Sequence, residues 1–266
     1  MDILRREIAP IEPEGWGLID TAAKEALSAR LSGRKFLDID GPHGIGYAAE
    51  PLGRLKIVKD DAPSGLGYGI HQVLPLVEVR RLFDLPIWEM DNLARGAKDV
   101  NLDPLIAACR NAAEFEESAV YDGLKPAGIV GLNQAVGEKK VPLKLTVDGV
   151  VDAMGEAKHK LIEAGICGAA HLVASPAMWK YLSRITPAGV LREVVEKQLG
   201  GSVVRSAAVK DALLVASRGG DAILTLGQDF AVGYHSHTDT KVSLFLTESF
   251  TFRVATPEAL VGFAVG

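Results

Sequence analysis

The chain has 266 residues, of which 48% are hydrophobic and 24% charged, and its formal net charge is −5. This composition is typical of a folded globular protein and excludes a disordered chain. The 29 basic residues form no block, which argues against nucleic acid as a partner. The sequence has no run of about eighteen apolar residues, so no membrane-spanning helix is predicted. The N-terminus lacks a signal peptide and only two cysteines occur, so we expect a cytoplasmic protein.

The N-terminal part of the chain predicts one amphipathic helix and then a long two-stranded arm. Apolar residues recur at steps of three and four from Pro13 to Leu31, which is typical of a helix with one buried face. Two extended stretches follow at 53–59 and 70–85, separated by the turn sequence 60–65. An isolated hairpin is marginally stable in water, so this arm needs a partner surface.

The remainder mixes helices with short strands, which predicts an α+β fold. The last strand, at 242–254, is unusually long, and Glu248 interrupts its apolar face. Capping residues and periodicity predict helices at 104–121, 147–164, 176–184 and 190–199. Further strands are expected at 171–174, 203–206, 213–216, 223–226 and 229–235.

The chain contains few residue patterns that carry chemistry. Glu156 and His159 have di-iron spacing, but that site needs a second copy of the motif, so we expect a solvated helix face and no metal. His235 and His237 are interpreted as part of an exposed turn. Glu114, Glu116 and Glu117 are likewise expected on a solvated face, and we identify no catalytic residue. Trp88 could fill core or interface, or stack on a planar ligand.

Short motifs spread over almost the whole chain resemble those of one known family, and they occur in the family's order. They are Ile8-Ala9-Pro10, 33–38, Gly41-Pro42, Tyr47-Ala48-Ala49, 88–96, 113–116, 218–221, 227–229, Gly233-Tyr234, 248–254 and 257–259. By these motifs the chain resembles the shell proteins of encapsulin nanocompartments, also called the linocin or bacteriocin-like family.

The resemblance implies the fold of tailed-phage major capsid proteins, of the Hong Kong phage type. Residues 1–46 would form the N-terminal helix and arm, and 47–80 the extended E-loop. Residues 81–126 would form the peripheral (P) domain with a long spine helix, and 127–220 the axial (A) domain. Residues 221–266 would return to the P-domain and the base of the E-loop.

The resemblance also implies a structural protein that self-assembles into an icosahedral shell around a peroxidase or a ferritin-like enzyme. The short chain favours the smallest shell, of about 60 subunits. Two alternatives stay open at this point: a prophage capsid protein, and a hydrolytic enzyme or protease.

Matching positions assign sites to named residues. A cargo protein's C-terminal targeting peptide would bind an apolar groove on the inner wall. The pore at the five-fold axis would be formed by Arg184, Ile185, Thr186, Pro187, Ala188 and Gly189. Arg184 would give it a preference for anions, or would pair with an acidic neighbour such as Glu193 and leave the pore neutral. No cofactor is required, but a flavin on Trp88 with Arg80 as anionic-group partner is an expectation from one relative. The cargo-binding residues would be Leu27, Leu31, Arg34, Asp38, Phe230, Val232 and Tyr234.

Overall fold

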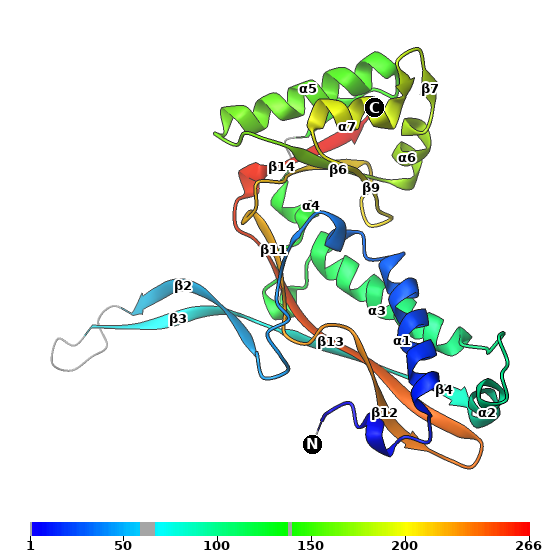
Figure 1. The fold of residues 1–266 in the computed structure, drawn as a ribbon. Helices are drawn as coiled ribbons and strands as arrows, with labels where there is room; N and C mark the ends of the chain where they lie inside the picture. Colours follow the sequence, from blue (N-terminus) through cyan, green and yellow to red (C-terminus); the bar gives the residue numbers. More distant parts are fainter. Residues whose placement is uncertain (1, 59–66, 138–139) are drawn as a thin grey trace.

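A five-stranded sheet built around one long strand forms the lower half of the molecule in Figure 1. The computed structural model describes residues 2–58, 67–137 and 140–266. The long strand, β13 (Lys241–Val254), pairs along one edge with β4 (Val77–Pro86). Its other edge is shared by β12 (Ala231–His237) and β11 (Ala222–Leu226), and β1 (Asp38–Asp40) extends the sheet beyond β11.

Two helices cover one face of this sheet. Helix α1 (Pro13–Ser28) packs against α3 (Asp103–Asp122), and both bury apolar side chains against β4, β12 and β13. Pro13 starts α1, where a missing backbone N–H leaves no hydrogen bond unmade. A short helix that the sequence analysis did not predict, α2 (Ile87–Ala94), follows β4 directly and contacts α1.

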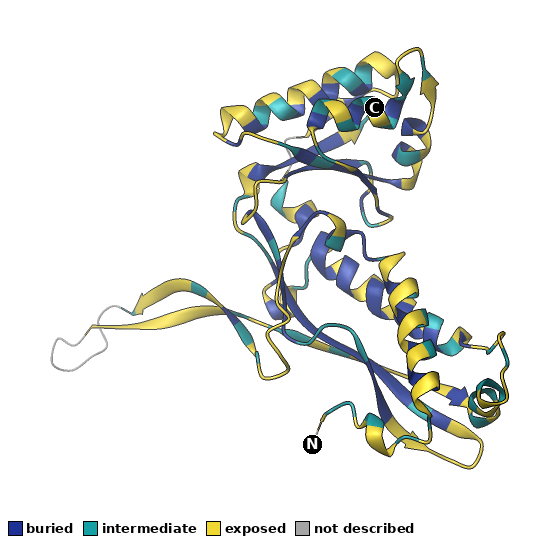
Figure 2. Cartoon of the chain, viewed as in Figure 1, coloured by how far each residue is buried: buried dark blue, intermediate teal, exposed yellow. Residues whose placement is uncertain are grey.

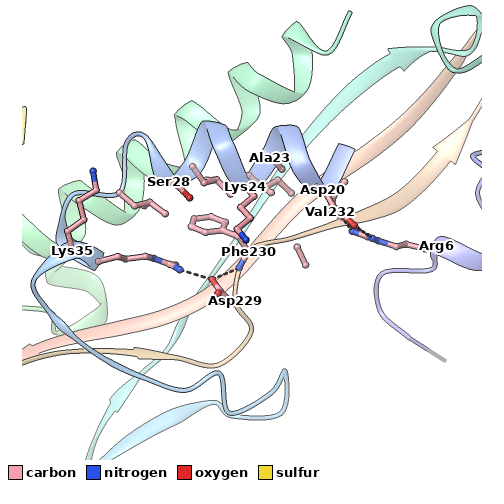
Figure 3. A pocket seen from close by; sticks show the side chains of 14 residues that line it. Arg6, Asp20, Ala23, Lys24, Ser28, Lys35, Asp229, Phe230 and Val232 are labelled. Atoms are coloured by element: carbon pink, nitrogen blue, oxygen red, sulfur yellow. Dashed lines mark hydrogen bonds and ion pairs between the residues drawn. The ribbon is translucent and has the colours of Figure 1, made fainter. Parts of the chain in front are cut away.

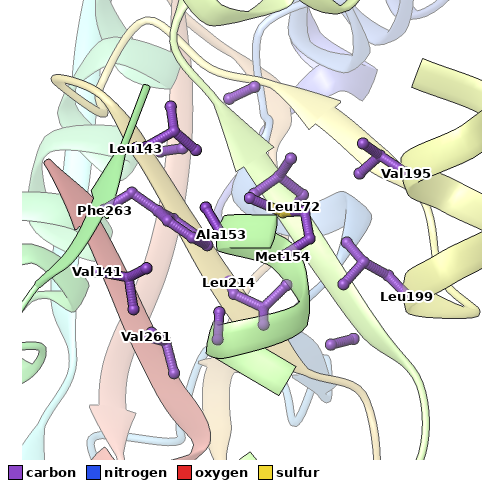
Figure 4. Close-up of a cluster of buried hydrophobic side chains, with 14 of the residues drawn as sticks. Val141, Leu143, Ala153, Met154, Leu172, Val195, Leu199, Leu214, Val261 and Phe263 are labelled. Atoms are coloured by element: carbon purple, nitrogen blue, oxygen red, sulfur yellow. The ribbon is translucent and has the colours of Figure 1, made fainter. Parts of the chain in front are cut away.

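A second five-stranded sheet forms the upper half. Its order is β5 (Val141–Leu143), β14 (Leu260–Val265), β10 (Ala212–Ala216), β6 (Ala170–Ala174) and β9 (Val203–Arg205). Helices α5 (Val147–Glu163), α6 (Pro176–Leu182) and α7 (Leu191–Leu199) pack on it around Met154, Leu172 and Phe263 (Figure 4). The short helix α4 (Leu132–Ala135) and a hairpin of β7 (Ile185–Thr186) and β8 (Gly189–Val190) complete this half.

An exposed two-stranded arm projects from the lower half. Its strands are β2 (Ala49–Val58) and β3 (Tyr68–Pro75), which pair with each other and with no third strand of the described chain. Figure 2 shows that most arm residues are exposed. The predicted arm is therefore confirmed, while its turn at 60–65 lies outside the described residues. The expected strand at 70–85 divides at Leu76, because the chain from Val77 onward pairs with β13.

The last strand departs from the expected course of the chain. Residues 221–266 were assigned to the P-domain, but β14 lies in the upper sheet between β5 and β10. The sequence analysis missed this strand, although Leu260–Val265 is a short apolar run. Among the described residues, none of the helices has the length and apolar character that crossing a membrane requires. The same residues contain no cluster of three or more metal-ligating side chains.

Candidate binding groove

A groove of about 640 Å³ lies between α1 and the start of β12 (Figure 3). Helix α1 supplies one wall because residues three and four apart share a helix face. Asp20 and Leu31 are eleven positions apart, and beyond the end of α1 Leu31 N still donates to Leu27 O at 3.0 Å, so this wall is about 17 Å long at 1.5 Å per residue. An extended peptide of about five residues spans that length. The groove is lined by Ala23, Lys24, Leu27, Leu31, Phe230 and Val232, among others.

An arginine–aspartate pair stands at each end of the groove. Arg6 binds Asp20 at 2.7 Å at one end, and Arg34 binds Asp229 at 2.7 Å at the other. Between these two ion pairs the lining is mainly apolar. Lys24, on α1, adds a positive charge to it. Such a channel matches an extended peptide with apolar side chains, since apolar pockets select alternate residues of a bound strand.

Buried carboxylates hold Arg34 in place. Glu116, on α3, accepts hydrogen bonds from Nε and Nη2 of Arg34, the shortest at 2.6 Å. Glu248, in the middle of β13, accepts a further bond from Nη2. The guanidinium also lies 5.0 Å from the centre of the Phe230 ring, which it holds at the end of the groove. Glu248 thus interrupts the apolar face of β13 because that position anchors Arg34.

A third buried glutamate, Glu117, fixes the turn before Arg34. Glu117 accepts hydrogen bonds from Ser32 Oγ and from the backbone N–H of Gly33, the latter at 2.8 Å. Burial raises the pKa of Glu117 to about 7. The solvated face expected for this part of α3 is therefore wrong for Glu116 and Glu117, both of which are buried. Burial and the neighbouring Glu116 also raise the pKa of Glu248 well above its ordinary value.

The groove brings together five of the seven residues expected to bind cargo. Leu27, Leu31, Arg34, Phe230 and Val232 all line it. The other two, Asp38 and Tyr234, do not line it.

Asp38 does not line the groove, because it lies on β1, where its carboxylate accepts a hydrogen bond from Gly220 N at 2.7 Å. Tyr234 is a core residue, packed with α1 and α3 and hydrogen-bonded through its hydroxyl to His237. Polar replacement of Tyr234 would therefore disturb folding as well as any groove function.

Apart from Arg34, the sequence analysis missed the charged residues of the groove. Lys24, Lys35 and Asp229 line it, and so does the pair of Arg6 with Asp20. Helical spacing could have indicated Lys24, because it stands three residues before Leu27 on the same face. No local pattern could have indicated Arg6, whose partner is 14 residues away and whose Nε donates to Val232 O at 2.8 Å.

The expected pore segment forms the tip of the upper half. Ile185 and Thr186 pair with Gly189 and Val190 across a turn made by Pro187 and Ala188. Ile185 is 86% exposed, while the guanidinium of Arg184 stacks 4.2 Å from the centre of the Tyr181 ring. Within the described chain Arg184 makes no ion pair, with Glu193 or any other acid.

The two residues expected to bind flavin lie apart in one subunit. Trp88 stands on α2 and is 66% exposed. Arg80 is six residues before the end of β4, about 20 Å along the strand. Its guanidinium lies 4.5 Å from the centre of the Phe245 ring and bonds Glu78. One subunit therefore does not bring Trp88 and Arg80 into a single site.

Comparisons with known proteins identify the family. Residues 1–251 match the model of a family described as an encapsulating protein for peroxidase. A type 1 encapsulin shell protein of Rhodospirillum rubrum is 34% identical over 98% of this chain and 96% of its own length. The chain belongs to the encapsulin shell family. An encapsulin subunit is a structural protein and not an enzyme, which excludes the hydrolase alternative.

Solved structures show the fold that encapsulins share with phage capsids. A virus-like particle from Pyrococcus furiosus matches with a TM-score of 0.65 at 15% identity, over 92% of this chain and 98% of that one. The capsid protein of Myoviridae phage XM1 matches with a TM-score of 0.57 at 10% identity, over 86% and 89%. The expected capsid fold is confirmed, and the sequence relatives favour a nanocompartment shell over a prophage capsid.

Proposed function

We propose that this encapsulin subunit closes into an icosahedral cytoplasmic shell of about 60 copies around a cargo enzyme. The observation that carries this is the arm, which has apolar side chains exposed on both faces: Leu55 and Ile57 on one, Tyr68 and Ile70 on the other. Exposed apolar surface of this kind marks an interaction site. At 28.3 kDa per chain the shell would weigh about 1.7 MDa. Native mass spectrometry tests this, and only monomers or dimers at micromolar concentration would contradict it.

The groove between α1 and β12 receives the C-terminal tail of the cargo. Its apolar floor and its length of about 17 Å support a short extended segment with apolar side chains at alternate positions. An ion pair closes each end of the groove, Arg6 with Asp20 and Arg34 with Asp229. These pairs limit the length of the segment that fits. Recognition of a tail leaves the folded part of the cargo free, so one shell could hold enzymes of different folds.

Loading of a fluorescent protein with a designed tail tests the groove. One tail follows a Gly-Ser linker with Leu-Ser-Ile-Ser-Leu, and the control tail replaces these apolar residues by serine. We expect only the apolar tail to be enclosed on co-expression, and Phe230→Ala shells to take up roughly tenfold less. Lys210→Ala, on the upper half, is the matched control. Equal loading of both tails by intact shells would contradict this groove while leaving shell formation in place.

The hairpin tip of the upper half lines a pore at the five-fold axis. Five copies of Arg184 around one axis would favour small anions, because the side chain is exposed and forms only a stacking contact with Tyr181. The test compares entry of small anionic and cationic probes into wild-type and Arg184→Glu shells. We expect the preference to reverse, and identical uptake of both probes by both shells would contradict the proposal.

Trp88 stacks on a flavin. Its exposed indole is available as a planar platform, while the anionic group of the flavin would need a cation other than Arg80 of the same subunit. Shells purified after riboflavin feeding should carry flavin absorbance, and Trp88→Ala shells of the same mass should lack it. Wild-type shells without flavin absorbance would remove the proposal.

A further inference from the structure

The outer edge of strand β12 lies open to the groove beside α1. Strand β12 pairs with β13 on one side, and the part of the chain that the structure describes supplies no strand on the other. Residues 230–232 of this edge line the groove, together with one face of α1. An open strand edge presents unpaired N–H and C=O groups, which makes it a template for pairing with another chain.

The alternation of bonded and non-bonded pairs fixes which groups of β12 point outward. In an antiparallel pair, every second residue directs its backbone N–H and C=O away from the partner strand. Tyr234 is one such residue, because its N–H donates to Leu4 O at 2.8 Å. Phe230 and Val232 are an even number of positions away, so their backbone groups also point outward. Arg6 Nε already donates to Val232 O at 2.8 Å.

Two groups on this edge are left without a partner. Among the described residues, none accepts a hydrogen bond from Val232 N, and none donates one to Phe230 O. The N-terminal segment leaves the edge before it reaches them, because Arg5 has a left-handed φ of 50° and a turn of 3₁₀ helix follows. The free donor and the free acceptor therefore stand on either side of Ala231, and both residues line the groove.

This spacing is the bonding pattern of a parallel strand. In a parallel pair, one residue of the added strand donates to the C=O before the residue opposite it and accepts from the N–H after that residue. A residue opposite Ala231 would therefore bond Phe230 O and Val232 N, which are the two free groups. Antiparallel addition would instead need both backbone groups of Val232, whose oxygen already accepts from Arg6.

We propose that the cargo tail binds the groove as a strand parallel to β12, an inference that rests on the proposed function. Side chains alternate between the two faces of a strand, and directly opposite residues share a face. The tail residue opposite Ala231 thus points away from α1. Its two neighbours point, like Val232, toward Leu27 and Leu31. The main-chain bonds supply affinity for any sequence, and the inward side chains supply selectivity.

Proline in the designed tail tests the main-chain bonds. In this register both serines of Leu-Ser-Ile-Ser-Leu turn their N–H groups toward β12, and the apolar residues turn theirs away. Leu-Pro-Ile-Pro-Leu lacks the inward N–H groups and should load roughly tenfold less than Leu-Ala-Ile-Ala-Leu. The matched control has proline where the N–H points away, so Leu-Ser-Pro-Ser-Leu should load like Leu-Ser-Ala-Ser-Leu. Equal loading of the first pair into intact shells, or a proline defect in the second pair, would overturn the parallel strand.

Hydrogen exchange in loaded shells gives an independent readout. The Val232 amide is unbonded in the empty subunit and should exchange roughly tenfold more slowly once the apolar tail is enclosed. The Gly233 amide points toward β13 in both states and is the internal reference. An unchanged Val232 amide in shells that hold the cargo would overturn the strand alone. Failure of the apolar tail to enter intact shells would instead overturn the groove, and the strand with it.

Discussion

At the scale of single residues, Arg34 links three parts of the chain. It joins Glu116 of α3 and Glu248 of β13, both fully buried, to Asp229 at the end of the groove. The pair of Arg6 with Asp20 has similar geometry at the other end, but solvent reaches it. Screening by water makes an exposed pair worth little, whereas a buried carboxylate that loses its partner is strongly destabilising.

Replacing these two arginines should therefore give unequal results. Arg34→Met leaves two buried carboxylates without a cation and should lower the free energy of unfolding by about 3–5 kcal/mol. Arg6→Met, as the matched control, should lower it by about 1 kcal/mol or less. Chemical denaturation of the two variants beside the wild-type chain measures both values. Equal, small losses would show that the buried network contributes nothing to stability.

Glu117 should make stability depend on pH. Its pKa rises from an ordinary value of 4.5 to about 7 in the folded chain. Below pH 4.5 the carboxyl is protonated in both states, so burial carries no electrostatic penalty. Between these values the unfolded chain releases the proton and the folded chain keeps it, so the free energy of unfolding falls by up to about 1.4 kcal/mol per pH unit.

Glu117→Gln tests this dependence. The amide keeps an acceptor for Gly33 N and cannot ionise, so the variant should lose much of the fall in stability between pH 4.5 and pH 7. Denaturation midpoints measured across that range check the result. A variant whose stability follows the same pH curve as the wild-type chain would assign the dependence to another group.

At the scale of elements, helix α5 has one buried face and one exposed face. Met154 is fully buried among the side chains of the upper sheet, while Ile162 on the same helix is 51% exposed. Met154→Ala should cost about 2–5 kcal/mol, because the removed atoms leave a cavity. Ile162→Ala should change the free energy of unfolding by about 0.5 kcal/mol or less. Thermal denaturation of both variants tests the difference, and similar melting temperatures would contradict this packing.

Elements with strong periodicity could be predicted from the sequence, and those fixed by distant partners could not. Apolar residues at steps of three and four from Val147 onward predicted α5. Alternating apolar residues from Val242 onward predicted β13. Helix α2 was missed because it is short and follows a strand directly, and its N-cap, Pro86, provides no capping side chain. The groove residues Leu27 and Leu31 followed from the resemblance to encapsulins, whereas Glu248 gained its role only through Arg34, 214 positions away in the chain.

At the scale of the whole molecule, the arm is separable from all three buried clusters. The described arm residues from Pro51 to Val73 contribute no side chain to any of the three buried clusters. Replacing residues 52–73 by a short Gly-Ser turn should therefore leave a folded monomer, with a melting temperature within about 4 °C of the wild-type monomer. This variant should not close into shells. Size-exclusion chromatography shows the outcome, and shells of normal mass without the arm would mean that other surfaces suffice for assembly.

Strand β14 has a consequence for synthesis on the ribosome. It lies between β5 and β10 in the upper sheet, although β10 is complete by residue 216 and β14 ends at residue 265. The nascent chain thus exposes the arm, α1, α3 and β4 while both sheets still lack strands, β11 to β13 in the lower half and β14 in the upper half. If assembly requires a finished upper half, translation order itself keeps partly made subunits out of the growing shell.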